Sequence, residues 1–162
     1  MGQENEMMLD TYNQKLKKLI TGHEGKRAAP YKCPAGAMTI GVGWNMDANP
    51  LPKRQRDHLK QYGFITESMI DELLNISIER AEGDCMRLFP EFEKFDETRR
   101  MALTDFVFQL GFTRASRFVH AIAAINTGRW EDAAAHMLDS AWAKQTRRRA
   151  LKITEMIEIG DS

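Results

Sequence analysis

Three side chains in one short stretch of the sequence could act together in acid–base chemistry. They are the carboxyl of Glu24, the thiol of Cys33 and the hydroxyl of Thr39. A carboxylic acid can donate a proton, an ionised thiol can act as a base or a nucleophile, and a hydroxyl can hold a water molecule. Such chemistry requires the three groups to face one small space, so the elements that carry them must bring them together.

A predicted β-hairpin performs this task. Its strands cover residues 29–32 and 38–43, and the turn between them contains Pro34 and Gly36. Proline fixes its own φ, and glycine can adopt the positive φ that a tight turn needs. Because the hairpin follows directly on the end of a helix, we expect the carboxyl, the thiol and the hydroxyl to lie within reach of one another.

The helix before the hairpin is predicted at residues 7–22, where apolar side chains recur at helical spacing. Glu24 falls at its last turn or just beyond. There the negative end of the helix dipole favours the protonated carboxyl, the form that a general acid needs. The alternative is an ordinary glutamate in solvent, which would be poorly placed for helix stability. Position and chemistry together favour the catalytic interpretation.

Length and charge limit the functions open to the chain. With 162 residues it has the size of one domain that buries roughly two-thirds of its unfolded surface. Lys plus Arg equals Asp plus Glu at 23 each, so no overall field favours nucleic acid or an anionic membrane. We therefore expect no nucleic-acid partner, no stable membrane association and a monomer. A basic cluster at residues 144–152 is interpreted as a solvated helix face, with attraction to an anionic polymer as the alternative.

The cysteines and histidines form no metal or disulfide motif. Cys33 and Cys85 are far apart and have no Cys-x-x-Cys spacing, and the four histidines are scattered. We therefore expect no metal and no cofactor. No apolar run approaches the length of a membrane span, and the first ten residues lack the charged-then-apolar order of a secretory signal.

The rest of the chain predicts loops and helices. Residues 45–52 are expected to be loop, after which Pro52 begins a short helix that ends at Gly63. Thr66 caps a longer helix that runs to about Met86.

Further helices follow in the C-terminal half. Residues 96–110 are apolar nearly all round, which predicts a buried helix that Gly111 ends. Ser116 is expected to cap the next helix and Gly128 to stop it, and two more are expected at residues 130–140 and 146–159. The fold class is therefore α+β, mostly α.

Two separate blocks of the sequence resemble the phage lysozyme and endolysin family, glycoside hydrolase family 24, of the T-even phage lysozyme type. The family pattern is a glutamate, eight residues, an aspartate or sometimes a cysteine, five residues, and a threonine before Ile-Gly-x-Gly. Here the pattern is met by Glu24, Cys33 and residues 39–43. The second block is Arg99-Arg100-x-Ala102-Leu103, Val107-Phe108-Gln109-x-Gly111, Arg129-Trp130-Glu131-x-Ala133-Ala134 and Trp142-x-x-Gln145-Thr146-x-x-Arg149-Ala150.

The resemblance runs from about residue 16 to about residue 157 and implies a lysozyme-like, two-lobed fold in a single domain, residues 1–162. Expected are a small β-containing lobe at about 22–65, a connecting helix at about 66–90 and a helical lobe at about 91–160. The helix at 7–22 would pack on the helical lobe.

The implied reaction is hydrolysis, with inversion, of the β-1,4 bond between N-acetylmuramic acid and N-acetylglucosamine in peptidoglycan. Such a cleavage needs a proton for the leaving oxygen and a nucleophile for the oxocarbenium carbon. Glu24 would supply the proton, and Thr39 would hold the attacking water. Cys33 stands where most of the family has aspartate, and an ordinary thiol is mostly neutral at neutral pH. Cys33 as base, as electrostatic partner and as spectator all stay open.

The resemblance also implies residues that bind the substrate or support the acid. Phe108 and Gln109 match two substrate positions, and Gln109 can bond a sugar or peptide amide. Asn45 and His136 stand at two more, where the family has an apolar residue and an amide. Arg149 matches the arginine that meets the catalytic glutamate. That pair would favour the ionised carboxyl and so oppose the effect of the helix end.

Two alternatives to a hydrolase stay open. A lytic transglycosylase needs one acid–base group and no held water, and the missing aspartate keeps it in view. A catalytically inactive cell-wall-binding protein of the same fold is the other, although the presence of Glu24 and Thr39 argues against it. In every case the implied partner is peptidoglycan. The chain would be made without a signal peptide in the cytoplasm of a bacterium or phage host and would act on the wall after release.

Overall fold

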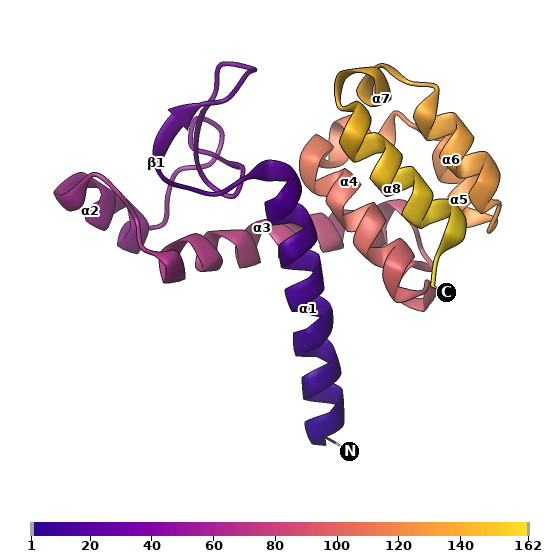
Figure 1. Ribbon diagram of the computed structural model, residues 1–162, viewed down its shortest axis with the longest axis horizontal. Helices are drawn as coiled ribbons and strands as arrows, with labels where there is room; N and C mark the ends of the chain where they lie inside the picture. Colours follow the sequence, from indigo (N-terminus) through magenta and orange to yellow (C-terminus); the bar gives the residue numbers. More distant parts are fainter. Residues whose placement is uncertain (1, 162) are drawn as a thin grey trace. The chain divides into compact units, whose positions relative to one another are not determined.

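The computed structural model describes residues 2–161 and, for side chains, residues 11–161 (Figure 1). The chain divides into two compact units, Met1–Ser77 and Ile78–Ser162. The N-terminal unit contains helix α1 (Gly2–Glu24), strands β1 (Arg27–Lys32), β2 (Met38–Gly41) and β3 (Trp44–Asn45), helix α2 (Lys53–Tyr62) and the first half of helix α3 (Glu67–Leu88). The boundary between the units falls inside α3.

The strands form one antiparallel sheet in the order β1-β2-β3. The predicted hairpin is confirmed: the N–H of Gly36 donates to the carbonyl of Cys33 at 2.8 Å, and Gly36 has a φ of 91°. The second strand ends at Gly41, two residues earlier than predicted. Asn45, expected in a loop, belongs to a short third strand, because Gly41 and Gly43 both take positive φ and turn the chain back onto β2.

Helix α1 is longer than predicted at both ends, running from Gly2 to Glu24. The predicted inner positions Tyr12, Leu16 and Ile20 are buried, whereas the side chain of Leu9 lies outside the described residues. Glu24 therefore occupies the last helical position. The packing of this helix on the helical lobe stays a prediction.

The ends of α2 and the start of α3 are those that the sequence predicts. Gly63 closes α2 with a φ of 80°. The Thr66 hydroxyl accepts a hydrogen bond from the N–H of Met69 at 3.3 Å, so it caps α3. Every helix within residues 2–161 falls short of the length or the apolarity that a membrane span requires.

The C-terminal unit is helical. After a short 3₁₀ turn (Phe92–Lys94) come α4 (Glu97–Ser116), α5 (Val119–Asn126), α6 (Trp130–Leu138), α7 (Ala141–Gln145) and α8 (Arg147–Ile159). The core forms around α4, as its apolar sequence predicts: Ala102, Leu103, Phe106 and Val107 are buried there. The Trp142 ring packs edge-on against Phe106, with ring centroids 4.9 Å apart, so Trp142 is a core residue.

One predicted helix boundary in this unit is confirmed and one is wrong. Gly111, with a non-helical φ of 78° and ψ of 166°, ends the first helical segment of α4 as predicted, and a second segment continues after this kink to Ser116. Ser116 does not cap α5, because its hydroxyl donates to the carbonyl of Thr113 at 2.7 Å and α5 begins only after Phe118. A local side-chain bond to the preceding turn thus replaced the expected cap.

Candidate active site

The carboxyl of Glu24 lies against the turn between β2 and β3. A Cβ placed on Gly43 would lie 3.0 Å from the Glu24 Oε2 and 3.1 Å from its Cδ, so a side chain at this position would have to displace the Glu24 carboxyl by a few tenths of an ångström. Gly43 also has a φ of 68°, which L-residues with side chains rarely adopt. The second glycine of Ile-Gly-x-Gly therefore serves two needs: it makes the turn and it leaves space for the carboxyl.

The thiol of Cys33 lies at the start of the hairpin turn among hydrogen-bond donors. The backbone N–H of Ala37, and after it those of Ala35 and Gly36 and the Thr39 hydroxyl, hold the pKa of this thiol below its usual range, against an opposing effect of burial. Donors stabilise the thiolate and not the thiol. The ionised fraction at neutral pH is therefore larger than for the ordinary thiol that the sequence led us to expect.

Thr39 links the turn to the sheet. Its side chain is buried, and its Oγ1 lies 3.1 Å from the carbonyl oxygen of Ala37, to which it donates. Its hydroxyl is also within hydrogen-bonding reach of the Cys33 sulfur. Since the hydroxyl oxygen has two lone pairs, it can still accept a hydrogen bond from a water molecule.

Tyr31 joins this group, although the sequence argument did not single it out. It lies directly opposite Thr39 in the sheet and is half-buried. Burial, followed by the negative charges of Glu24 and Cys33, raises the pKa of its phenol, while Arg27 lowers it. Strand alternation could not identify Tyr31, because Cys33 lies in the turn after β1, and it is the cross-strand pairing with Thr39 that brings Tyr31 into this group.

The N-terminal unit thus brings together the predicted acid, thiol and hydroxyl. Glu24 and Cys33 both act on the phenol of Tyr31, and Tyr31 faces Thr39 across the sheet. A carboxyl, a thiol with a lowered pKa and a buried hydroxyl around one phenol form a constellation suited to acid–base chemistry.

Two residues that follow the motif have mainly local contacts. The Oδ1 of Asn45 accepts from the N–H groups of Asp47 at 2.9 Å and Ala48 at 3.0 Å, so its carbonyl holds the turn and its amide N–H₂ is the part that can meet a ligand. Trp44 is buried, and its Nε1 donates to the carbonyl of Asn49 at 2.9 Å. Its role there is structural.

The predicted substrate residues of the C-terminal unit lie in three settings. Gln109 accepts a hydrogen bond at 2.8 Å from the Nε1 of Trp142, which fixes its amide and leaves its N–H₂ to donate. Phe108 is partly buried against the core. His136 is exposed and stacks on the ring of His120, with centroids 5.5 Å apart.

Arg149 is a buried cation with a buried partner. Its Nε donates to Oδ1 of Asp105 at 3.2 Å, and its Nη2 donates to the same oxygen. The sequence argument did not find Asp105, although an acidic residue inside an otherwise apolar helix is a recognisable signal for a buried ion pair. The pairing of Arg149 with Glu24 stays a prediction.

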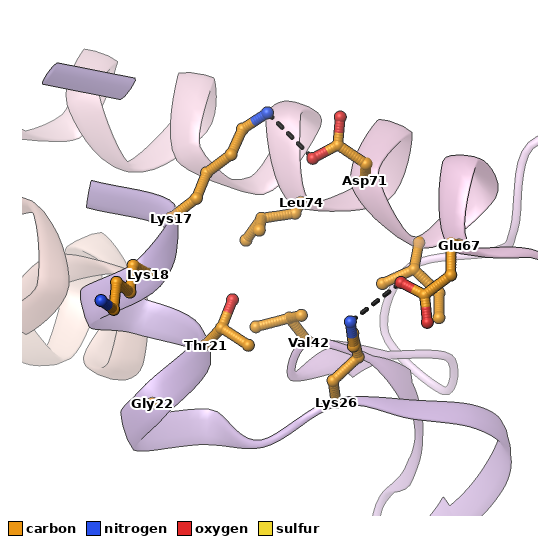
Figure 2. Close-up of a pocket in the computed structure, with 10 residues that line it drawn as sticks. Lys17, Lys18, Thr21, Gly22, Lys26, Val42, Glu67, Asp71 and Leu74 are labelled. Atoms are coloured by element: carbon orange, nitrogen blue, oxygen red, sulfur yellow. Dashed lines mark hydrogen bonds and ion pairs between the residues drawn. The ribbon is translucent and has the colours of Figure 1, made fainter. Parts of the chain in front are cut away.

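A hollow of about 420 Å³ in the N-terminal unit is lined by other residues (Figure 2). Its apolar part comes from Val42, Ile70 and Leu74. Two ion pairs flank it: Lys17 with Asp71 at 2.9 Å and Lys26 with Glu67 at 2.8 Å, both drawn in Figure 2. Because its carboxylates are ion-paired and exposed, the hollow offers no counterpart to the group around Tyr31.

Among residues 11–161, no three histidine, cysteine, aspartate or glutamate side chains gather into a group that could hold a metal ion.

Comparison with known proteins covers nearly the whole chain. The family model described as phage lysozyme matches residues 21–154. Probable T4-type lysozymes 2 and 1 of Dictyostelium discoideum are 26% and 24% identical to the chain over 161 residues, which are 90% of the chain and 94% of each relative. The pre-baseplate central spike protein Gp5 of Enterobacteria phage T4 is 26% identical over 166 residues, 94% of this chain but 29% of Gp5. Because the family model spans well over half of the sequence and includes Glu24, Cys33 and Thr39, the chain belongs to the phage lysozyme family and is a glycoside hydrolase of the lysozyme type.

Proposed function

We propose that the chain is a peptidoglycan muramidase, an endolysin that hydrolyses the β-1,4 bond between N-acetylmuramic acid and N-acetylglucosamine. The observation that carries the proposal is the position of Glu24 at the end of α1, packed on Gly43 and close to the phenol that Cys33 also faces. Family membership supports the substrate class, and the geometry supports the assignment of roles.

In the proposed reaction Glu24 donates its proton to the leaving glycosidic oxygen as the bond to the anomeric carbon breaks. A water molecule attacks the opposite face of that carbon, which inverts its configuration. The Thr39 hydroxyl holds this water, and the Cys33 thiolate accepts its proton. The lowered pKa of the thiol supports this role, because a thiolate can accept a proton and can also stabilise the developing positive charge.

The residues proposed to bind peptidoglycan are Asn45, Phe108, Gln109 and His136, with Arg149 supporting Glu24. Gln109 is favoured among them because its bond to Trp142 fixes the amide and directs the N–H₂ as a donor. The protein is proposed to act as a monomer on the cell wall, after release from the cytoplasm in which it is made.

Substitution of the acid tests the proposal. Glu24→Gln should lower the rate of wall lysis by at least about 10²-fold, since general acid catalysis contributes about 10²–10⁴. Binding to peptidoglycan should be retained because the amide is isosteric with the carboxyl. The matched control is Glu67→Gln, an exposed glutamate of the same unit, which should lyse like wild type. An active Glu24→Gln variant would refute the assignment.

The mass of the products separates the proposal from its rivals. Hydrolysis leaves a reducing muramic acid, whereas a lytic transglycosylase leaves the anhydro sugar, which is lighter by one water. Product mass spectrometry on purified peptidoglycan should therefore show the hydrated ends. The anhydro sugar would indicate the transglycosylase instead, and a wild type that binds peptidoglycan without cleaving it would indicate a wall-binding protein.

A further inference from the structure

One face of the small sheet carries a cation beside the candidate catalytic groups. Arg27 lies opposite Gly41, and Tyr31 lies opposite Thr39. Residues directly opposite each other in an antiparallel pair project from the same face. Tyr31 and Thr39 therefore share one face. The pairing of β1 with β2 is irregular between Arg27 and Tyr31, but the guanidinium of Arg27 lies over the Tyr31 ring and so on the side of the sheet that Tyr31 faces.

The ring of Tyr31 holds the guanidinium of Arg27 in place. The Cζ of Arg27 lies 4.8 Å from the centroid of that ring, within the range of a cation–π interaction. Arg27 is exposed, and among residues 11–161 it has no carboxylate partner. Its positive charge is therefore oriented by an aromatic ring, and no carboxylate among residues 11–161 pairs with it.

Two lysines of the same unit are arranged differently. Lys26, the neighbour of Arg27 in the sequence, pairs with Glu67 at 2.8 Å. Lys17 pairs with Asp71 at 2.9 Å. Arg27 thus combines three properties: it shares the face of Thr39, it is oriented by stacking, and it lacks a carboxylate partner in the described chain. A guanidinium in this state presents N–H groups suited to a carboxylate in a ligand.

We propose that Arg27, held over the ring of Tyr31, binds a carboxylate on the peptide stem of the muramic acid residue and so selects anionic peptidoglycan over a neutral glycan. This specificity role rests on the proposed muramidase function. The sugar rings of the substrate are uncharged, and its negative charges lie on the side chains of the muramic acid residues. A cation beside Glu24 and Thr39 would therefore favour the placement of the glycan chain in which a muramic acid residue lies at the cleaved bond.

The test is a cycle in which the arginine and the substrate carboxylates are changed separately and together. Two soluble substrates are used: native peptidoglycan strands, and the same strands with their stem carboxylates converted to amides. Amidation should lower the kcat/KM of wild type about fivefold, mainly by raising KM. A fivefold effect is at the upper end of what a partly exposed charge pair contributes. Arg27→Gln should have a kcat/KM about fivefold below that of wild type on native strands, and the same kcat/KM as wild type on amidated strands.

Three further variants control the test. Arg27→Lys keeps the charge and should retain most of the preference for native strands. Tyr31→Phe keeps the ring and should retain the preference, whereas Tyr31→Leu should lose it. Arg56→Gln removes the same charge from exposed α2 and should discriminate between the substrates like wild type. Raising the salt concentration should reduce the wild-type preference, because exposed ion pairs are screened.

The outcomes separate this proposal from the proposed function. If Arg27→Gln still prefers native strands fivefold, or loses the same factor on both substrates, the specificity role is refuted while the muramidase stands. If wild type cleaves neither substrate, the muramidase is refuted. In that case the role of Arg27 is decided by binding. Glu24→Gln should bind labelled native strands about fivefold more tightly than amidated strands, and the double variant Glu24→Gln/Arg27→Gln should bind both equally.

Discussion

Among single residues, Cys33 and Cys85 show how position changes the chemistry of one side chain. Backbone N–H donors from the hairpin turn lower the pKa of Cys33, whereas burial in the helical core raises that of Cys85. Donors stabilise a thiolate, and an apolar environment destabilises it. In the proposed reaction Cys33 therefore takes over part of the work of a carboxylate, while Cys85 is a buried residue of the helical core.

We expect Cys33 to react with iodoacetamide faster than free cysteine at neutral pH, with the midpoint of the rate–pH curve below that of free cysteine. The sign follows from the lowered pKa: the reactive thiolate appears at a lower pH. Cys85 should react only on unfolding. Mass spectrometry of timed samples measures both sites, and Cys33→Ser is the control.

The same thiol should matter for activity. Alkylation of Cys33 and Cys33→Ala should both remove most of the lytic activity, whereas Cys33→Asp should retain it because a carboxylate performs the same proton transfer. Full activity in Cys33→Ala would make the thiol a spectator, and a midpoint equal to that of free cysteine would contradict the role of the turn donors.

Among the elements, the turn between β2 and β3 determines where Glu24 sits. Gly41 and Gly43 both have positive φ, at 64° and 68°, but their surroundings differ. A Cβ on Gly41 would lie 3.6 Å from Ile70, an ordinary contact, while a Cβ on Gly43 would meet the Glu24 carboxyl at 3.0 Å. The turn therefore controls the acid through one of its two glycines.

The two alanine variants should separate backbone strain from displacement of the acid. Gly41→Ala and Gly43→Ala should each lower the free energy of unfolding by about 1–2 kcal/mol, the cost of a left-handed residue with a Cβ. Only Gly43→Ala should also lower kcat, by at least about tenfold, since it pushes Glu24 out of position. Urea denaturation and lysis assays measure the two effects, and equal loss of kcat in both variants would contradict the argument.

At the scale of the whole molecule, the chain has no net charge, so its electrostatics depend on individual pairs. Asp105 is fully buried and Arg149 nearly so, and their bonds tie α4 to α8 within the C-terminal unit. Neither charge could remain in the core without its partner, because an unpaired buried ion is costly. This pair is therefore a condition for the helical core as well as for the position of Arg149.

Removing one member of that pair should destabilise the protein strongly. Asp105→Asn should lower the free energy of unfolding by about 3–5 kcal/mol, because it removes the buried carboxylate that pairs with the Arg149 guanidinium. Asp57→Asn breaks an exposed pair with Lys53 and should leave the stability unchanged within error. Chemical denaturation followed by circular dichroism compares the two variants. Equal stabilities would mean that the Asp105 pair is dispensable.

Local chemistry determined much of this molecule from the sequence alone. Several elements were predicted correctly because their signals act within a few residues of chain. These signals are the apolar periodicity of α1, the turn residues Pro34 and Gly36, the Thr66 cap and the Gly63 stop. The motif spacing likewise identified Glu24, Cys33 and Thr39, since one helix end and one hairpin suffice to bring them together.

Tertiary structure decided the rest, because it depends on contacts between distant residues or on the space around a group. The lowered pKa of Cys33 needs the folded turn, Tyr31 enters the site only through its pairing with Thr39, and Asp105 meets Arg149 across 44 positions of sequence. The Ser116 boundary failed for a local reason: its hydroxyl donates to the carbonyl of Thr113, three positions earlier in the chain. A sequence states which groups are present, and folding decides which of them meet.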